Sequence, residues 1–424
     1  MSRTRTSKTV IRTYLTLALF NTLAASLIWG INTLFLLDAG LTIVEAFVAN
    51  AFFTAGMVLF EIPTGVIADS KGRRLSYLLG TLTLAITTFL YLVLAWTQAP
   101  FIAWAAVSLF LGLGFTFFSG ATDAWLVDAL KFTKYKGQLE SVFGKAQVVG
   151  GVAMLVGSVA GGLIAQFSNL GVPYLVRVGL LVATFIIAFI FMRDLGFAPE
   201  KGVKYSKAIK TILHSSIKFG FGKPAVRWVM LAAPFISGVM VYVFYAFQPY
   251  LLELYGDNTA YWIAGLAAAI VAGAQIIGGL LVPYIRRLFK KRTTLLLTGA
   301  ILSSLILIIV FLIPNFYFVI AMIVLWGLIG AAVMPVRQAY LNDLIPSKQR
   351  ATVLSFDSLL GSSGGVVSQP ALGKAADVYS YGASYMIAGI VQLAAIPFLV
   401  LANRLKEDAD EKVAVVENPD SPTL

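Results

Sequence analysis

Three ionisable side chains stand inside long apolar stretches of this sequence, where they could do chemistry. Glu61, Asp123 and Arg337 each lie about six or seven residues from one end of their stretch, or about 10 Å deep at 1.5 Å per residue of helix. A charge costs about 2.5–3.5 kcal/mol inside a membrane span, so each is a functional candidate. A carboxyl that is buried in one state and wet in another binds protons differently in the two, which can couple protons to a conformational change. The alternative is a set of permanent ion pairs that braces the inner ends of the helices.

Other chemistries lack the residues they need. The chain has no cysteine, so disulfides, thiolate metal sites and cysteine nucleophiles are excluded. His214 is the only histidine, which rules out a histidine metal cluster or a paired-histidine relay. No nucleotide-binding loop and no Ser-His arrangement is present. We therefore expect no metal, no cofactor and no enzymatic activity.

The middle of the apolar stretches offers neutral and aromatic side chains for binding a ligand. Such a lining suits a lipophilic or weakly polar compound better than a sugar phosphate or a dicarboxylate, which would need facing Arg or Lys. The alternative is that many of these rings face lipid. Nearer the outer face, we expect Asp38, Glu45, Arg177 and the Lys374/Asp377 pair to be interfacial or snorkelling. The candidate cavity residues are Asn21, Trp29, Phe115, Phe118, Phe244, Tyr245 and Gln248.

The elements that carry these residues are predicted to be transmembrane helices. With 59% hydrophobic and 12% charged residues, most of the 424-residue chain is too apolar for a soluble domain. Segments of alternating polarity, which a β-barrel requires, are absent from the sequence. Apolar stretches between turn signals predict an all-α membrane protein with twelve spans. They cover residues 12–37, 42–67, 74–97, 100–130, 139–167, 172–194, 226–252, 258–286, 293–313, 315–342, 352–378 and 381–403.

The basic residues predict the orientation of these spans. An even number of spans places both termini on one side, and with that arrangement all but three of the 32 Lys and Arg residues fall on that side. The exceptions are Arg177, Arg337 and Lys374. The positive-inside rule makes this side the cytoplasm. The net charge of +12 therefore reflects membrane orientation, and nucleic-acid binding is not expected.

The chain is predicted to consist of two six-span halves. Residues 1–194 form an N-terminal bundle and residues 226–403 a C-terminal bundle. The 195–225 connection is either a solvated basic linker or an interfacial helix with Ile209, Ile212, Leu213 and Ile217 on one face. The 404–424 tail is acidic and predicted to be disordered.

An internal repeat supports this division. A shift of 215 residues places Gly112 on Gly327 and Asp128 on Asp343, which relates the fourth span to the tenth. Asp123 and Arg337, on these two spans, are therefore predicted to face each other and to form a salt bridge in the outward-open state that breaks on inward opening.

The segment Gly65-Val66-Ile67-Ala68-Asp69-Ser70-Lys71-Gly72-Arg73-Arg74 is a very short hairpin between the second and third spans. It resembles the corresponding hairpin of the major facilitator superfamily, G-x-x-x-D-[RK]-x-G-R-[RK], although Ser70 replaces a basic residue. The resemblance implies secondary transport, with two six-helix bundles related by a pseudo-twofold axis and the substrate bound between them.

The resemblance also implies a cytoplasmic gate. Asp69 would meet the start of the eleventh span near residues 352–355, and Arg73 would pair with Asp128. In the second half, Asp343 and the 286–292 basic cluster occupy the corresponding places. Gly157, Gly161 and Gly162 are similar to the superfamily's G-P-x-x-G-G antiporter motif, but Ser158 replaces proline. Close helix packing is the alternative function of these glycines.

These observations predict a secondary active transporter that works by alternating access in the cell membrane. The expected activity is proton-coupled export of small lipophilic compounds, with a metabolite or nutrient symporter or uniporter as the alternative. A membrane sensor or lipid enzyme that transports nothing is a further alternative from another class. The expected partners are a small-molecule substrate, protons and the lipid bilayer, and the protein is expected to function as a monomer.

Overall fold

The computed structural model describes residues 6–199, 216–346, 349–405 and 407–411, and the regular structure within these ranges is helical. The first half contains α1 (Ser7–Trp29), α2 (Asn32–Asp38), α3 (Ile43–Lys71), α4 (Arg73–Trp96), α5 (Phe101–Thr116), α6 (Ala121–Phe132), α7 (Leu139–Phe167) and α8 (Gly171–Phe191). The second half contains the π-helix η1 (Ser216–Phe221), α10 (Pro224–Tyr255), α11 (Tyr261–Arg287), α12 (Arg292–Leu312), α13 (Phe316–Leu344), α14 (Arg350–Val378), α15 (Tyr381–Leu393), α16 (Ile396–Asn403) and α17 (Asp408–Glu411).

The helices account for the twelve predicted spans. Among the described residues, 11 helical segments are long and apolar enough to cross a membrane. The remaining predicted span is α14, which is 29 residues long but contains the charged residues Asp357, Lys374 and Asp377. Twelve helical crossings are therefore present, and α14 is the most polar of them.

Three predicted spans are interrupted rather than continuous. The first breaks at Gly30 and Ile31, between α1 and α2. The fourth breaks before α6, where Gly120 takes a left-handed conformation with φ of 65°. The twelfth breaks before α16, which has Pro397 in its first turn. Glycine adopts positive φ without a steric penalty and proline cannot extend a preceding helix, so the second and third breaks have a local cause. Gly30 keeps a negative φ of −77°, and its Cβ position is occupied by α11.

The two halves repeat one packing scheme. In the first half α1 packs on α7 and α8, α3 packs on α5, and α4 packs on α5 and α8. In the second half α10 packs on α14, α15 and α16, α11 packs on α13, and α12 packs on α13 and α15. The halves meet through α7 with α11 and through α3 with α14, which are equivalent pairs under exchange of the halves. This equivalence defines two six-helix bundles related by a pseudo-twofold axis.

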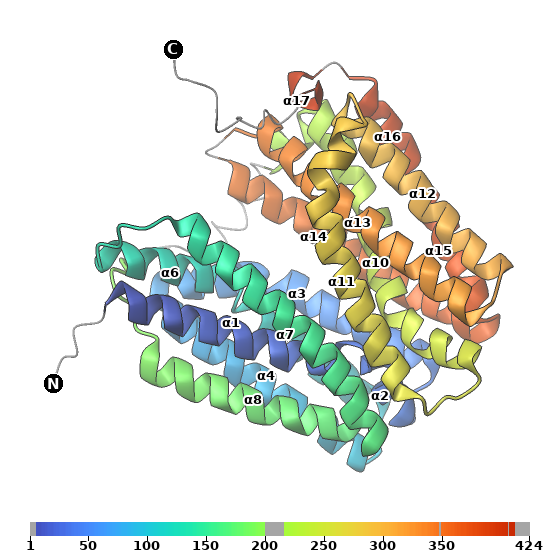
Figure 1. Ribbon diagram of the computed structural model, residues 1–424, viewed down its shortest axis with the longest axis horizontal. Coiled ribbons are helices and arrows are strands. Elements are labelled where there is room, and N and C mark those ends of the chain that lie inside the picture. Colours follow the sequence, from blue (N-terminus) through green and yellow to red (C-terminus); the bar gives the residue numbers. More distant parts are fainter. Residues whose placement is uncertain (1–5, 200–215, 347–348, 406, 412–424) are drawn as a thin grey trace.

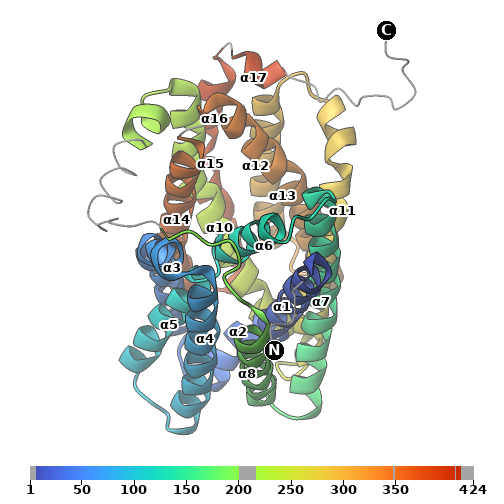
Figure 2. The same cartoon turned by 90° about the vertical axis from the view of Figure 1, so that its left-hand side faces the viewer.

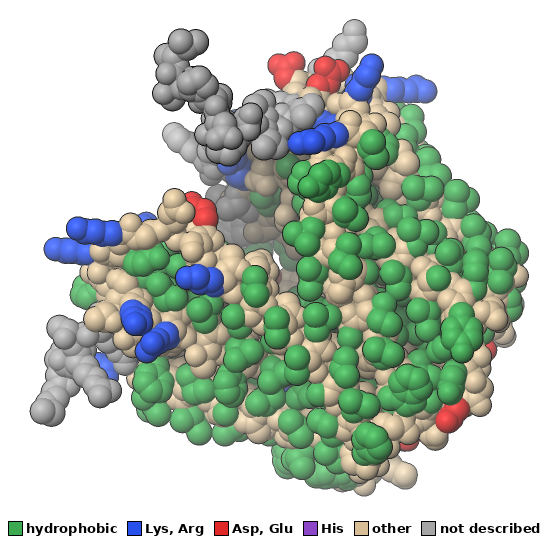
Figure 3. Space-filling view, viewed as in Figure 1, with side chains coloured by type: hydrophobic (Ala, Val, Ile, Leu, Met, Phe, Trp, Pro, Cys, Tyr) green, Lys and Arg blue, Asp and Glu red, His purple; other side chains and the backbone are tan. Residues whose placement is uncertain are grey.

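The bundles form a V. Figure 1 shows them meeting near α2 and diverging toward the ends that carry α6 and α17. Figure 2, turned by 90°, shows the same two stacked bundles, with α6 of the first bundle lying at an angle to α5. In Figure 3, Lys and Arg gather at the diverging ends, whereas hydrophobic side chains cover the surface where the V closes. We call the diverging ends the basic side and the other end the opposite side.

Both segments outside the bundles differ in part from expectation. Ile209, Ile212 and Leu213 of the expected interfacial helix lie outside the described residues, as does His214, while Ile217 lies in η1 and is exposed. The tail was predicted to be disordered from 404, but residues 408–411 form α17. This prediction was wrong because Asp410 is buried and accepts hydrogen bonds from the Thr293 backbone N–H (2.8 Å) and hydroxyl (2.7 Å). Residues 412–424 lie outside the described part.

Candidate functional site

A cavity of about 460 Å³ lies between the bundles on the basic side, and we call it the vestibule. Its wall in the first bundle comes from α3, α5 and the break before α6, and its other wall comes from the first half of α14. The lining includes Met57, Glu61, Phe115, Thr116 and Ser119 on one side and Leu354, Ser355, Ser358, Leu359 and Ser362 on the other. The vestibule therefore combines one carboxyl with several hydroxyls and an apolar lining.

A second, smaller cavity of about 40 Å³ lies deeper, and we call it the recess. It has the ring of Phe115 in common with the vestibule. Phe53, in the wall of the recess, packs edge to face with Phe115 at a centroid distance of 5.4 Å. These two rings thus separate the recess from the vestibule. The polar and aromatic lining of the recess includes Trp29, Asn32, Asn50, Tyr91, Arg177 and Tyr245.

Arg177 is the unexpected member of the recess. Its position on α8 predicted an interfacial or snorkelling side chain, but it is only 2% exposed. Its guanidinium lies 5.9 Å from the centre of the Phe115 ring. The prediction was wrong because α8 turns this residue toward α1, α3 and α5, and not toward lipid. The expectation of a lipophilic ligand rested on a mid-membrane region without a facing Arg or Lys, and Arg177 removes that premise.

Gln248 closes the V on the opposite side and does not line either cavity. Its side-chain oxygen accepts from the Thr33 backbone N–H (2.8 Å), and its Nε2 donates to the Trp29 carbonyl (2.8 Å). These backbone groups lie on either side of the break between α1 and α2. Gln248, which lies in the second bundle, therefore provides hydrogen-bond partners for two backbone groups at the break in the first span.

Further contacts join the two bundles on the opposite side, where Gln248 also lies. Thr33 donates to the Tyr245 carbonyl at 3.0 Å, and Gln369 on α14 donates to the Thr54 hydroxyl on α3 at 3.0 Å. Gly162 and Gly265 bring α7 and α11 so close that a Cβ on Gly162 would lie 2.8 Å from the Gly265 Cα. These contacts join the bundles on the opposite side, where a separate cavity of about 420 Å³ remains between them, lined among others by Asp38 of α2 and Glu253 of α10.

Glu61 and Asp123, which were predicted to lie at one depth, have different surroundings. Glu61 lines the vestibule and accepts a hydrogen bond from Ser119 at 2.5 Å. Asp123 lies in the first turn of α6 and accepts from the Tyr14 hydroxyl at 2.7 Å. Because the break at Gly120 creates a new helix N-terminus, the carboxylate of Asp123 also interacts favourably with the helix dipole.

Arg337 pairs within its own bundle. Its two Nη atoms contact both carboxylate oxygens of Asp357 on α14 at 2.7 and 2.6 Å. No ion pair joins Arg337 to Asp123 in the described part of the chain. The sequence places that pair in the outward-open state alone, so it stays a prediction. Common depth in the membrane did not identify the partner, because helix rotation directs Arg337 toward α14.

The first hairpin contains a single residue, Gly72, between α3 and α4. Gly72 has a φ of 119°, and a Cβ there would lie 2.4 Å from an oxygen of Asp194. Asp194 accepts from the Arg74 backbone N–H at 2.9 Å and so occupies the N-terminus of α4. Burial raises the pKa of Asp194, against the opposing effect of that N–H and of the nearby guanidiniums. Gly65, in contrast, has open space around it.

The predicted pairing of Arg73 with Asp128 is not present. Arg73 forms an ion pair with Asp69 one turn earlier, and Asp128 forms no ion pair with a described residue. Arg74 donates to the Phe189 carbonyl at 2.7 Å. Arg74 therefore holds the hairpin to the end of α8, and no hydrogen bond or ion pair joins Asp69 to a described residue of α14. The break at Gly120 redirects the helix that carries Asp128.

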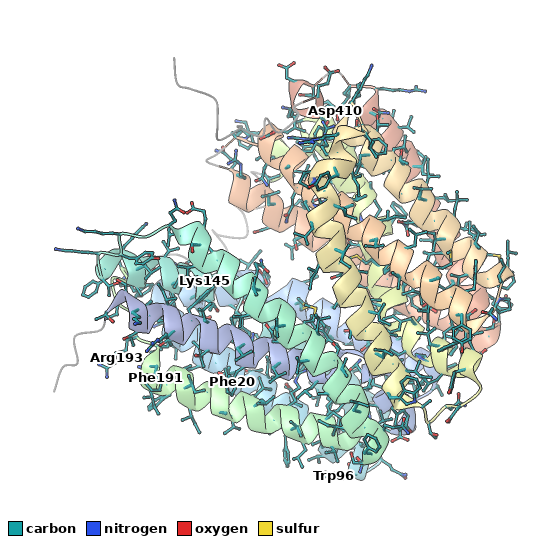
Figure 4. All side chains as sticks on the ribbon, in the orientation of Figure 1. Phe20, Trp96, Lys145, Phe191, Arg193 and Asp410 are labelled. Atoms are coloured by element: carbon teal, nitrogen blue, oxygen red, sulfur yellow. The ribbon has the colours of Figure 1, made fainter. Side chains whose placement is uncertain are left out.

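The second bundle contains the arginine–aspartate ion pair that corresponds to the absent Arg73–Asp128 pair of the first bundle. Arg292, at the start of α12, pairs with Asp343 at 2.8 Å. Asp410 occupies the N-terminus of α12 as Asp194 occupies that of α4. Figure 4 shows Asp410 at the basic side of its bundle; Lys145 and Arg193 lie at the same side of the other, with Trp96 at the opposite side. The two bundles therefore share their helix caps but differ in one ion pair.

The glycines of α7 serve packing. A Cβ on Gly157 would lie 2.0 Å from the Ser26 hydroxyl, and one on Gly161 would lie 1.8 Å from the Leu27 carbonyl. Gly162 faces Gly265 in the other bundle. Small residues at this spacing let α7 approach α1 and α11 closely, as expected for helix association in lipid.

The structure divides the predicted cavity residues other than Gln248 into three groups. Trp29, Phe115 and Tyr245 line the recess. Phe118 packs on Tyr77 inside the first bundle, and Phe244 packs edge to face on Trp29 at 6.2 Å. Asn21 lines neither cavity and forms no hydrogen bond with a described residue.

Sequence reasoning missed Arg177, Asn50 and Asp357 as site residues. Each is a polar or charged residue inside a predicted span, and each is at most 8% exposed. The cost of a charge in lipid could have identified Arg177 and Asp357. Asn50 carries no such signal, because a neutral amide in a helix is common.

Two pseudo-symmetric six-helix bundles with a cavity between them define a multi-pass membrane protein of the carrier type. The sequence matches the Major Facilitator Superfamily over residues 14–312 and 286–422. The chain belongs to this superfamily, and it is a transporter of that family.

Relatives agree with this assignment. The uncharacterized MFS-type transporter YxaM of Bacillus subtilis (strain 168) is 21% identical over 406 residues, which cover 93% of this chain and 96% of YxaM. Among solved structures, the nucleoside transporter NupG superposes with a TM-score of 0.76 at 10% identity, covering 94% of this chain and 100% of NupG. A D-xylose-proton symporter superposes with a TM-score of 0.63 at 18% identity, covering 93% and 96% of the two chains. At these identities the structures support the fold alone.

Proposed function

We propose that the protein is a secondary active transporter that moves a small solute by alternating access. The observation that carries this proposal is the asymmetry of the V, in which the bundles pack on the opposite side and leave the vestibule on the basic side. By the positive-inside rule the basic side faces the cytoplasm and the protein lies in the cell membrane. The structure then corresponds to the inward-facing state of a monomer.

The hydrogen bonds that join the bundles on the opposite side are few and neutral. They include the hydrogen bonds of Gln248 and the Gln369–Thr54 bond. A neutral hydrogen bond contributes about 0.5–1.5 kcal/mol net, so breaking this set lies within the free energy that binding of a small ligand supplies. The bundles can therefore rock about the central cavities while each keeps its internal packing.

Protons are the coupling ion in this proposal, and Glu61 is their binding site. Its carboxyl lines a cavity that is wet in this state and would lose water when the basic side closes. Desolvation favours the neutral form of a carboxyl, so closing the vestibule would take up a proton at Glu61. Asp123 and the Arg337–Asp357 pair brace the helices in this scheme.

A metabolite symporter is favoured over an exporter of lipophilic compounds by one observation. Arg177 places a cation in the recess, where an uncharged lipophilic ligand would leave it without a counter-charge. The names of two similar structures, a nucleoside transporter and a D-xylose-proton symporter, agree with a metabolite substrate.

A cysteine at position 358 tests the proposal, because the natural chain has no cysteine and Ser358 lines the vestibule. We expect Ser358→Cys in inside-out vesicles to react with a membrane-impermeant maleimide. We expect its labelling rate, relative to that of the exposed Glu140→Cys, to fall as the pH is lowered, because loss of thiolate slows both cysteines alike. The double variant that combines Ser358→Cys with Glu61→Gln, which mimics the protonated carboxyl, should give slow labelling at every pH. Glu140→Gln, an exposed acid at the start of α7, should leave the pH response unchanged. A labelling rate of Ser358→Cys, relative to Glu140→Cys, that is independent of pH would contradict coupling through Glu61.

A further inference from the structure

The recess contains two buried hydrogen-bond donors that lack acceptors. Neither the Nε of Arg177 nor the Nδ2 of Asn50 has a hydrogen-bond partner in the described structure. Arg177 also forms no ion pair with any described residue. Each side chain is at most 3% exposed, and both line the same cavity. Unpaired buried donors are costly, and a buried guanidinium without a counter-charge is more so.

The neighbouring polar groups already have partners of their own. The Tyr174 hydroxyl donates to Asn32 (3.0 Å), whose amide donates in turn to the Asn50 carbonyl oxygen (2.9 Å). Tyr91 and Ser108 hydrogen-bond to each other at 2.6 Å. The network therefore orients Asn50 so that its oxygen is used and its N–H₂ is left over. What the recess lacks is an acceptor, and a negatively charged one would also neutralise Arg177.

We infer that the recess binds the anionic group of the transported solute, a carboxylate or phosphate, through Arg177 and Asn50. This inference rests on the proposed transport function and names its substrate class. The guanidinium donates to anion oxygens in a planar fork, and the Asn50 amide donates to the same group. Binding in this recess gives the anion a buried, charged partner.

The size and lining of the two cavities extend the inference to the rest of the ligand. The recess, at about 40 Å³, holds little more than the anionic group. The body of the solute must then pass Phe53 and Phe115 into the vestibule of about 460 Å³. The rings of Trp29 and Tyr245 favour an apolar or aromatic body next to the anion. The expected substrate is therefore a small organic anion rather than a neutral sugar or an uncharged lipophile.

Thermal unfolding of the purified full-length protein tests the ligand chemistry. The probes are 3-phenylpropanoate, phenyl phosphate and the uncharged 3-phenylpropanamide, each at millimolar concentration. We expect at least one of the two anions to raise the unfolding temperature and the amide to leave it unchanged, because a ligand stabilises the state that binds it. The better of the two anions identifies carboxylate or phosphate. An equal response to the amide, or no response to either anion, would overturn the inference.

Variants assign the response to the recess. Arg177→Gln should weaken the apparent affinity for the anion at least tenfold, and Arg177→Lys should weaken it less. Arg287→Gln, an exposed arginine at the end of α11, should have no effect. If Arg177→Gln kept the wild-type affinity, the anion would bind elsewhere and the inference would be wrong.

Asn50→Asp provides a test that does not depend on the probe or on the folding of Arg177 variants. It places a carboxylate beside the unpaired guanidinium, so we expect a higher unfolding temperature than for Asn50→Ala and loss of the anion response. A buried carboxylate without a cationic partner would lower the unfolding temperature instead, and that result would overturn the inference.

The labelling of Ser358→Cys uses no substrate. Anion binding without pH-dependent labelling would therefore count against the proposed coupling alone, and the reverse result against the recess alone.

Discussion

At the scale of single residues, the ion pairs of this protein differ in how far they are removed from solvent. Arg337 and Asp357 are 14% and 9% exposed, whereas Lys374 and Asp377 are 62% and 33% exposed. Removing one partner of a buried pair leaves the other charge uncompensated, while an exposed pair contributes little. The enclosed pair should therefore matter most for the stability of the second bundle.

This difference gives a prediction for Asp357. Asp357→Asn should lower the free energy of unfolding by about 3–5 kcal/mol, because it leaves Arg337 buried without a counter-ion. Asp377→Asn should change it by less than about 1 kcal/mol. Thermal unfolding in the same detergent measures both. Equal small effects would mean that Arg337 finds another partner.

The residue scale is also where prediction from sequence was weakest. The charges of Glu61, Asp123 and Arg337 were visible as exceptions in apolar spans, but their partners were not. Arg337 pairs with Asp357 and Asp123 with Tyr14 because of how each helix is rotated in its bundle. Arg177 was misplaced for the same reason, since sequence position gives depth in the membrane but not the direction of a side chain.

At the scale of elements, the shortest connection in the chain depends on one glycine. Gly72 is the only residue between α3 and α4, its φ is 119°, and Asp194 fills the space where a Cβ would lie. Gly65, in the same motif, has nothing within 4 Å. The motif therefore contains one glycine that the backbone requires and one that this conformation does not.

The two glycines make a matched pair of variants. Gly72→Ala should cost about 1–3 kcal/mol of stability, because alanine is strained at this φ and displaces the Asp194 cap. Gly65→Ala should cost nothing or stabilise α3 slightly, since alanine favours a helix over glycine. Unfolding temperatures of both variants check this. A larger loss for Gly65→Ala than for Gly72→Ala would show that the structural role of the motif is assigned to the wrong residue.

Element positions followed from the sequence to within a few residues, and the breaks did not. Apolar stretches located twelve crossings because lipid requires about 20 apolar residues in each helix. Gly30 and Gly120 lie inside long apolar stretches, next to a few polar residues such as Asn32 and Ser119, which do not distinguish them from glycines that pack. The ordered α17 was missed because it depends on Asp410 meeting the N-terminus of α12, which is a contact between distant parts of the chain.

At the scale of the whole molecule, the two-bundle fold follows from the sequence, while the conformation does not. The duplication was visible in the shift that relates Asp128 to Asp343, and the packing of the bundles has the same symmetry. The direction in which the V opens depends on small differences between contacts such as those of Gln248 and Gln369. An energy difference of a few kcal/mol between two packings leaves no pattern in the residue types.

Alternating access requires the two ends of the V to move in opposite directions. The α7–α11 pair offers positions at both ends: Glu140 and Arg287 lie on the basic side, and Phe167 and Asn258 lie on the opposite side. All four are exposed, and the natural chain contains no cysteine that would have to be removed. Spin labels on Glu140→Cys/Arg287→Cys and on Phe167→Cys/Asn258→Cys therefore report the two ends separately.

Electron–electron distance measurements on these two double variants in lipid, at neutral and acidic pH, test the central claim most directly. We predict that acidification shortens the 140–287 distance and lengthens the 167–258 distance in the same fraction of molecules. Adding Glu61→Gln should produce the acidic distribution at neutral pH. Distances that stay fixed at both ends, or that change in the same direction at both, would contradict alternating access about the central cavities.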